Sequence, residues 1–129
     1  MPEPDVIALE SRRQELLEAI AGIGELRAGS LKSRYRKCGK PNCHCAAEGD
    51  PGHGLYWSVS RLIKGKLHSR AVPAAAVVKT QDQVEECRRL RALTAELIEV
   101  SDALCELRLA EHRAESGKRG RLRPRLVRR

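Results

Sequence analysis

Residues 55–72 read LYWSVSRLIKGKLHSRAV, and this stretch decides the fold. Lys64-Gly65 at its centre suits a two-residue hairpin turn, because glycine readily adopts the positive φ that such turns need. The residues on either side alternate between two sets of side chains, as they do in β-strands. The sequence therefore predicts an antiparallel hairpin with strands over residues 55–63 and 66–72.

The turn also predicts the register, and so the two faces of the hairpin. One face carries Trp57, Val59, Arg61, Ile63, Lys66, His68, Arg70 and Val72. The other carries Tyr56, Ser58, Ser60, Leu62, Leu67, Ser69 and Ala71. The first face combines cations with an aromatic ring and is predicted to contact nucleic acid, while the second is predicted to pack on a helix. Alternatively, Trp57 and Val59 belong to a hydrophobic core, and the cations only lie at the margin of that core.

A third strand is predicted upstream, over residues 30–37. Its side chains alternate so that one side is basic. The candidate nucleic-acid-binding residues of the sheet are Lys32, Arg34, Arg36, Trp57, Arg61, Lys66, His68 and Arg70.

A cysteine cluster follows this strand in the pattern C-x4-C-x-C, with a histidine beyond a turn-rich spacer. Three thiolates and one imidazole form a closed structural zinc site. The predicted ligands are Cys38, Cys43, Cys45 and His53, with His44 as a competing fourth ligand. Three free thiols are the alternative. Four protein ligands leave no open position, and the chain has no nucleophile elbow, phosphate loop or clustered carboxylates, so we expect no enzyme.

Long amphipathic helices are predicted on both sides of the β segment, over residues 4–28 and 80–115. The second helix carries a heptad seam of Leu90, Leu93, Leu97, Val100, Leu104 and Leu107. We expect the two helices to pack antiparallel, like a coiled coil. Because the second helix is longer, its seam is expected to form a homodimer or bind a partner helix. Cys87 and Cys105 are expected to be small packing residues.

Charge is segregated along the chain. The formal net charge is +8, and residues 29–73 and 117–129 are the two basic blocks. Segregation of this kind is typical of proteins that bind polyanions. The basic tail, residues 117–129, is predicted to be disordered and to add non-specific affinity for phosphates. Its candidate contacts are Lys118, Arg119, Arg121, Arg123 and Arg125.

Together these patterns predict an α+β fold. A three-stranded antiparallel β unit, residues 29–73, is inserted between the helices, and a Cys3His metal site stabilises it. Residues 1–116 are predicted to form one helix–β–helix domain. The N-terminus has neither the basic region nor the apolar region that a secretory signal needs. No apolar run is long enough to span a membrane. We therefore expect a cytoplasmic protein.

The stretch from Gly29 to Pro73 resembles a family of small, uncharacterised bacterial and archaeal proteins that are often encoded near transposases and other mobile-element genes. The resemblance rests on CGKPNCHCA at residues 38–46 and on PGHGLY at residues 51–56. Where this chain has Leu55 the family usually has Pro, and where it has Trp57 the family often has Tyr. The resemblance implies a role in DNA mobility and does not name an activity.

The sequence thus predicts a non-enzymatic nucleic-acid-binding accessory protein, with DNA preferred over RNA as its ligand, that serves transposition or recombination. Two alternatives stay open. One is a coiled-coil assembly or adaptor protein with a purely structural zinc unit. The other is an RNA-binding protein, which shares the same electrostatics.

Overall fold

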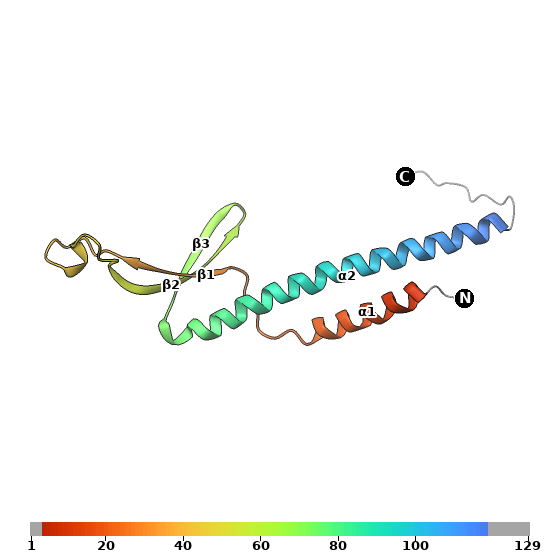
Figure 1. The fold of residues 1–129 in the computed structure, drawn as a ribbon, viewed down its shortest axis with the longest axis horizontal. Coiled ribbons are helices and arrows are strands. Elements are labelled where there is room, and N and C mark those ends of the chain that lie inside the picture. The colour runs from red at the N-terminus through yellow and green to blue at the C-terminus, as the bar shows by residue number, and fades with distance from the viewer. Residues whose placement is uncertain (1–3, 119–129) are drawn as a thin grey trace. The chain divides into compact units, whose positions relative to one another are not determined.

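The computed structural model describes residues 4–118, whose main elements are two long helices and a three-stranded sheet (Figure 1). The elements are α1 (Pro4–Ala21), β1 (Ser30–Arg36), η1 (His44–Ala46), β2 (His53–Ile63), β3 (Lys66–Val72), η2 (Ala74–Ala76) and α2 (Val77–Lys118). The predicted α+β class, with its antiparallel sheet, is confirmed. The chain divides into two compact units, and α2 contributes to both. Whether residues 1–116 behave as one domain stays a prediction.

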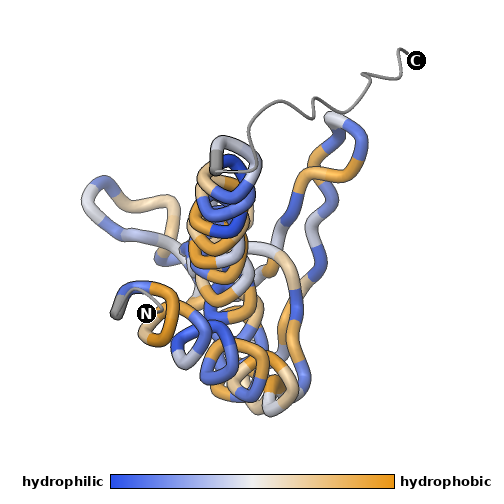
Figure 2. The backbone as a smooth tube through the Cα atoms, turned by 90° about the vertical axis from the view of Figure 1, so that its right-hand side faces the viewer, coloured by the Kyte–Doolittle hydropathy of each residue, from blue (hydrophilic) through white to orange (hydrophobic). Residues whose placement is uncertain are grey.

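The first unit pairs α1 with the part of α2 from Ala92 onward. The two helices run antiparallel, as expected (Figure 1). Leu16 of α1 is buried against Val100 and Leu104 of α2. Apolar and polar residues recur along both helices, so that each can bury one side and leave the other in water (Figure 2). Partly buried neighbours complete this core: they are Val6, Leu9, Leu93 and Leu97.

The heptad seam of α2 is therefore used within the chain. Val100 is 8% exposed and Leu104 is 2% exposed, because α1 covers the middle of the seam. Two ion pairs between the helices flank this core: Arg12 with Glu96 at 2.6 Å and Arg108 with Glu10 at 2.7 Å. Pairing of the seam with a second chain stays a prediction.

Both helices differ from their predicted bounds. Helix α1 ends at Ala21 rather than at residue 28, because Gly22 and Gly24 each weaken a helix by about 1 kcal/mol relative to alanine. Helix α2 begins at Val77 and continues to Lys118, so it is longer at both ends than the predicted 80–115. Thr80 was predicted to begin this helix, but it lies buried inside the first turns.

The second unit runs from Ile23 to Arg91 and contains the sheet, the cysteine loop and the start of α2. Residues 23–29 are irregular rather than helical, and they dock on α2 through two backbone amides. The Arg27 amide donates to the Gln83 carbonyl at 2.9 Å, and the Gly24 amide donates to Glu86 Oε2 at 2.9 Å. This docking replaces the last helical turns that the apolar spacing predicts.

The Glu86 contact makes the stability of this unit depend on pH. The Gly24 amide, and then Arg89, lower the pKa of Glu86 below its ordinary value of 4.5. A carboxylate with a depressed pKa stabilises the fold above its ordinary pKa, and this contribution is lost as the pH falls through the folded-state pKa. We expect the free energy of unfolding to fall less in Glu86→Gln than in the wild type between about pH 6 and about pH 3.

Chemical denaturation followed by Trp57 fluorescence measures this, because Trp57 is the one tryptophan of the chain and lies in the second unit. Glu85→Gln is the matched control, since Glu85 bonds only to Gln81 on its own helix among the residues described. Equal pH dependence in the Glu86→Gln and wild-type proteins would contradict the prediction.

The sheet has the strand order β1-β2-β3, with both pairs antiparallel. The predicted hairpin register is confirmed: Trp57 pairs with Val72, Val59 with Arg70, Arg61 with His68 and Ile63 with Lys66. At the turn, Lys64 has φ 52° and Gly65 has φ 80°. Two consecutive positive φ angles are the signature of a type I′ turn. The short turn therefore determines the register, as the sequence predicts.

The predicted roles of the two hairpin faces are wrong. The face predicted to lie open is buried at its end distant from the turn, and the face predicted to pack on a helix is exposed beside the turn. Val59 and Val72 are buried with Val84 of α2, so the face predicted to lie open packs against the helix. Leu31, Trp57, Ala76 and Val77 complete this core. The opposite face, predicted to meet a helix, exposes Leu62 by 68% and Leu67 by 67%. The alternative reading, in which Trp57 and Val59 anchor a core, is the one that the structure favours.

Candidate functional site

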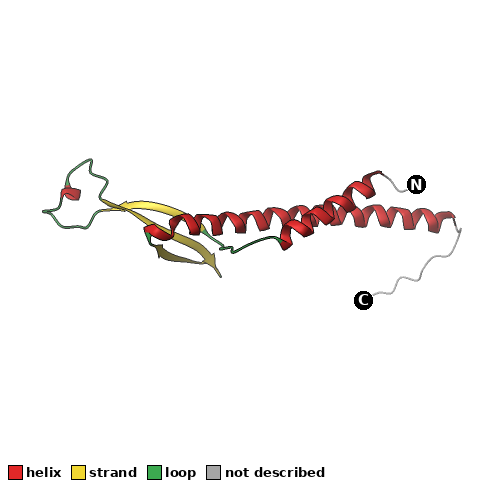
Figure 3. Cartoon of the chain, turned by 90° about the horizontal axis from the view of Figure 1, so that it is seen from below, coloured by secondary structure: helices red, strands yellow, loops and turns green. Residues whose placement is uncertain are grey.

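The loop between β1 and β2 carries the cysteines, and its only regular structure is the single turn η1 (Figure 3). Two features of β2 bring its first residue, His53, to this loop. The register shifts between Arg34 and Arg36, so that Arg36 pairs with His53. Gly52 has φ 103°, and a Cβ atom there would lie 2.6 Å from the Arg36 carbonyl oxygen. Only glycine allows the chain to pass so close to β1 before it enters β2.

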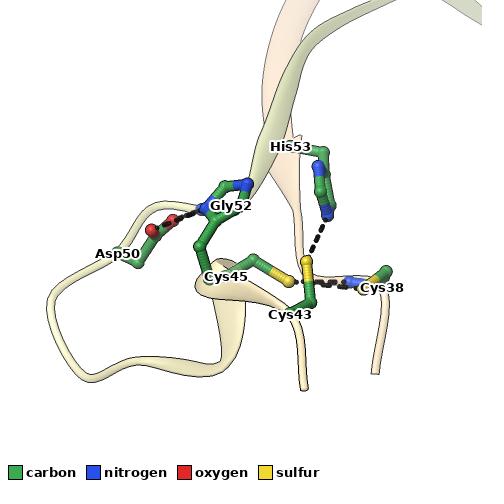
Figure 4. A network of polar contacts seen from close by, with 7 residues as sticks. Cys38, Cys43, Cys45, Asp50, Gly52 and His53 are labelled. Atoms are coloured by element: carbon green, nitrogen blue, oxygen red, sulfur yellow. Dashed lines mark hydrogen bonds and ion pairs between the residues drawn. The ribbon is translucent and has the colours of Figure 1, made fainter. Parts of the chain in front are cut away.

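The ligand atoms of Cys38, Cys43, Cys45 and His53 all lie within 4.8 Å of one another. Cys38 Sγ is 3.4 Å from Cys45 Sγ, and Cys43 Sγ is 3.1 Å from His53 Nε2 (Figure 4). In a tetrahedral site with metal–sulfur bonds of about 2.3 Å, neighbouring thiolates are about 3.8 Å apart. The four side chains are therefore close enough to bind one metal ion, as the spacing predicts.

Electrostatics favour a thiolate at this cluster. The Lys40 amide, and then the Cys45 and His53 side chains, lower the pKa of Cys38 to about 6. At Cys45 the Cys38 amide favours the thiolate, but burial and the neighbouring Cys38 and Cys43 thiols outweigh it and raise the pKa. Three thiols cannot all ionise side by side without a compensating cation. A bound metal ion supplies that compensation.

His44, the competing ligand, is directed elsewhere. Its Nδ1 lies 3.0 Å from Asp50 Oδ2, and its side chain is exposed. Asp50 also accepts a 2.8 Å hydrogen bond from the Gly52 amide (Figure 4). The His44 side chain, and then the Gly52 amide, lower the pKa of Asp50. Asp50 thus ties the loop to the residue that precedes His53, a role that the sequence analysis did not assign.

A basic cavity of about 1240 Å³ is the second candidate site, and all of its lining residues belong to the second unit. All three strands and the first part of α2 line it. Among these described residues seven are Lys or Arg and none is Asp or Glu: the cations are Lys32, Arg34, Arg36, Arg61, Arg70, Arg88 and Arg91. Tyr56, Trp57 and five serines also line the cavity. A concave surface with this lining suits an anionic ligand.

The cations of this basic cavity are available to a ligand. Six of the seven, all except Arg91, form no ion pair within the part of the chain that the structure describes. The second unit as a whole has fourteen Lys and Arg against six Asp and Glu, a net charge of +8. Repulsion among unpaired cations is relieved when an anion binds, so the surface is suited to phosphates.

The predicted nucleic-acid contacts are distributed over several places. Five sheet cations and Trp57 line the basic cavity, although Trp57 also packs against the core. Lys66 and His68 lie outside the lining, near the exposed hairpin turn. Of the tail residues, Lys118 is the last residue of α2. The others lie outside the described residues: they are Arg119, Arg121, Arg123 and Arg125.

Sequence reasoning missed Arg88 and Arg91, which complete the basic cavity from α2. The two arginines are three positions apart, so both lie on one side of the helix. This spacing was the available sequence signal for a basic helix surface. It did not suffice, because the helix was expected to meet the opposite face of the hairpin.

None of the helices described is long and apolar enough to cross a membrane. Searches of curated proteins and of solved structures gave no match to the chain. A family model described as a domain of unknown function, DUF6788, matches residues 7–86, which is more than half of the chain. The match includes most of α1, the whole sheet, the clustered Cys38, Cys43, Cys45 and His53, and the start of α2. The chain therefore belongs to the DUF6788 family.

Proposed function

We propose that this chain is a non-enzymatic nucleic-acid-binding protein whose basic cavity holds the phosphate backbone. The observation that carries the proposal is the lining of that cavity, where the described residues include seven cations and two aromatic rings but no Asp or Glu. Phosphate contacts supply most non-specific affinity for nucleic acid, and Arg and Lys make most of them. Serine hydroxyl groups can add hydrogen bonds to phosphate oxygens.

We propose Zn²⁺ as the metal of the Cys3His cluster. Soft thiolate ligands with one imidazole are the donor set of structural zinc sites. Four protein ligands would leave no open position for a substrate, which supports a structural role. In that role the metal would hold the loop at the end of β1 and β2, and the strands would then present Lys32, Arg34 and Arg36 to a ligand.

DNA is the ligand that we prefer, in an accessory role in transposition or recombination. This preference rests on the resemblance of residues 38–56 to proteins encoded near mobile elements. RNA shares the electrostatics of the basic cavity and is the first alternative. A coiled-coil adaptor is the second, and the exposed Ile7 and Ile98 of the helical unit favour it to a smaller degree.

A salt titration of binding tests the cavity. The variant Arg34→Gln/Arg70→Gln/Arg88→Gln removes three lining cations while keeping the size and polarity of the side chains close to those of arginine. Each lost phosphate contact lowers the slope of log affinity against log salt by about 0.9 on duplex DNA and about 0.7 on single strands. We expect the triple variant to lose about 2 to 3 units of slope.

The matched control is Arg13→Gln/Lys79→Gln/Arg113→Gln, which removes the same charge from exposed positions outside the cavity lining. Fluorescence anisotropy with labelled duplex DNA, single-stranded DNA and RNA measures both variants. Equal slopes for the two variants would rule out the cavity as the phosphate site. Tighter binding of RNA than of either DNA would replace DNA with RNA as the ligand.

A further inference from the structure

The tip of the β2–β3 hairpin exposes a pair of leucines. Leu62 and Leu67 are cross-strand partners, and their exposed fractions are 68% and 67%. Strand β1 pairs with β2 only as far as Ser60, so the hairpin extends beyond the three-stranded part of the sheet. Ile63, beside the turn, is 39% exposed. Two exposed leucines at the end of a narrow ribbon are unusual in a surface that only meets water.

The tip is ordered up to its turn. Pairing continues without interruption to Ile63 and Lys66, and the turn between them has the geometry of type I′. The next cross-strand pair on the same face is Ser60 and Ser69, whose Oγ atoms form a 2.7 Å hydrogen bond. The leucine pair therefore lies on a regular, hydrogen-bonded ribbon, whose insertion costs less backbone entropy than that of an irregular loop.

Charge indicates which partner the tip meets. No Asp or Glu occurs between residues 51 and 81, while Arg61, Lys64, Lys66, His68 and Arg70 all lie on the hairpin. Leu62 and Leu67 also line the basic cavity, next to its cations. An apolar wedge surrounded by cations is complementary to a duplex, in which phosphates flank stacked bases.

We propose that the hairpin tip enters the minor groove of duplex DNA and places Leu62 and Leu67 against a base step, so that the duplex bends. The inference rests on the proposed function and adds the mode of binding. Apolar side chains that insert from the minor groove partly unstack one step and kink the duplex. The bend brings flanking phosphates toward the cations of the basic cavity, and these contacts offset the cost of unstacking.

Energy transfer between dyes at the two ends of a duplex of about 25 base pairs measures the bend. We expect the wild-type protein to bend this duplex by between about 20° and about 90°. The variant Leu62→Ser/Leu67→Ser is expected to bind the duplex with a lower salt slope, because fewer flanking phosphates reach the cations of the basic cavity, and to reduce the bend below about 20°. Both leucines are exposed, so their replacement leaves the core around Val59 and Val84 intact.

The control Val78→Ser/Ile98→Ser removes two aliphatic side chains outside the hairpin, which are 74% and 61% exposed, and should bend DNA like the wild type. Leu62→Met/Leu67→Met should also keep the bend, because methionine can fill the same step. Binding without bending by the wild type, or equal bending by the serine variant, would overturn the wedge and leave the proposed function intact. Failure of the wild type to bind duplex DNA at any salt would contradict the proposed function itself.

Discussion

Removing the metal is expected to release residues 38–53 from their fold while the hairpin core persists. The loop between β1 and β2 buries little that could hold it otherwise: of its described residues only Cys45 is fully buried. In zinc-finger peptides the bound metal contributes about 10–16 kcal/mol at neutral pH, and this binding energy is the folding energy. Val59, Val72 and Val84 form a separate core that includes none of the four cluster residues, so we expect it to persist.

Hydrogen exchange with and without a strong chelator measures this expectation. Amides of residues 38–53 should lose nearly all protection, whereas those of β3 and of α2 should change little. Metal analysis of untagged protein should find one zinc ion per chain, and less than about 0.2 per chain would contradict zinc as the metal. Uniform loss of protection over the second unit would show that the cluster and the hairpin core fold together.

Matched substitutions separate the ligands from the other cysteines and histidines. Cys45→Ser should abolish tight metal binding, while Cys105→Ser makes the same chemical change at an exposed position on α2 and should have no effect. In the same way His53→Ala removes a ligand, whereas His44→Ala removes a side chain that bonds to Asp50. Equal metal loss in the two histidine variants would contradict His53 as the distinct fourth ligand.

Local chemistry explains which parts of this fold can be predicted from the sequence. The hairpin register follows from Lys64-Gly65, because a two-residue turn permits only one pairing of the strands. The clustering of the four candidate ligands follows in the same way from C-x4-C-x-C and the turn residues before His53. In both cases a few neighbouring residues determine the geometry, so no distant part of the chain is needed.

Features that depend on tertiary packing could not be predicted in this way. The apolar spacing of α1 continues to Ile23, but residues 23–29 gain more by docking on Gln83 and Glu86 than by extending the helix. Which hairpin face lies open depends on tertiary packing, because Val59 and Val72 are buried by Val84 of α2. The basic cavity joins residues from Lys32 to Arg91, which no local pattern connects.

Gly52→Ala is expected to weaken metal binding more than any other single change outside the four ligands. Gly52 has φ 103°, and an added Cβ would lie 2.6 Å from the Arg36 oxygen and 2.7 Å from its carbonyl carbon. The backbone conformation alone costs about 1–3 kcal/mol for a residue with a side chain. The contact with Arg36 adds to this cost, because backbone atoms cannot rotate away as a flexible side chain could.

Gly49→Ala is the control that separates these two effects. Gly49 also has a positive φ, 89°, but an added Cβ there meets nothing within 4 Å. Both variants therefore carry the conformational cost, and only Gly52→Ala pushes β2 away from β1 where Arg36 pairs with His53. Displacing His53 should lower metal affinity by about 10–100-fold, the range seen when groups that orient a ligand are lost.

Competition with a chromogenic chelator measures the affinity. Equal affinities for the two variants would mean that the close approach of the strands does not position His53. A larger loss in Gly52→Ala would show that the sheet and the metal cluster are coupled through this one backbone contact.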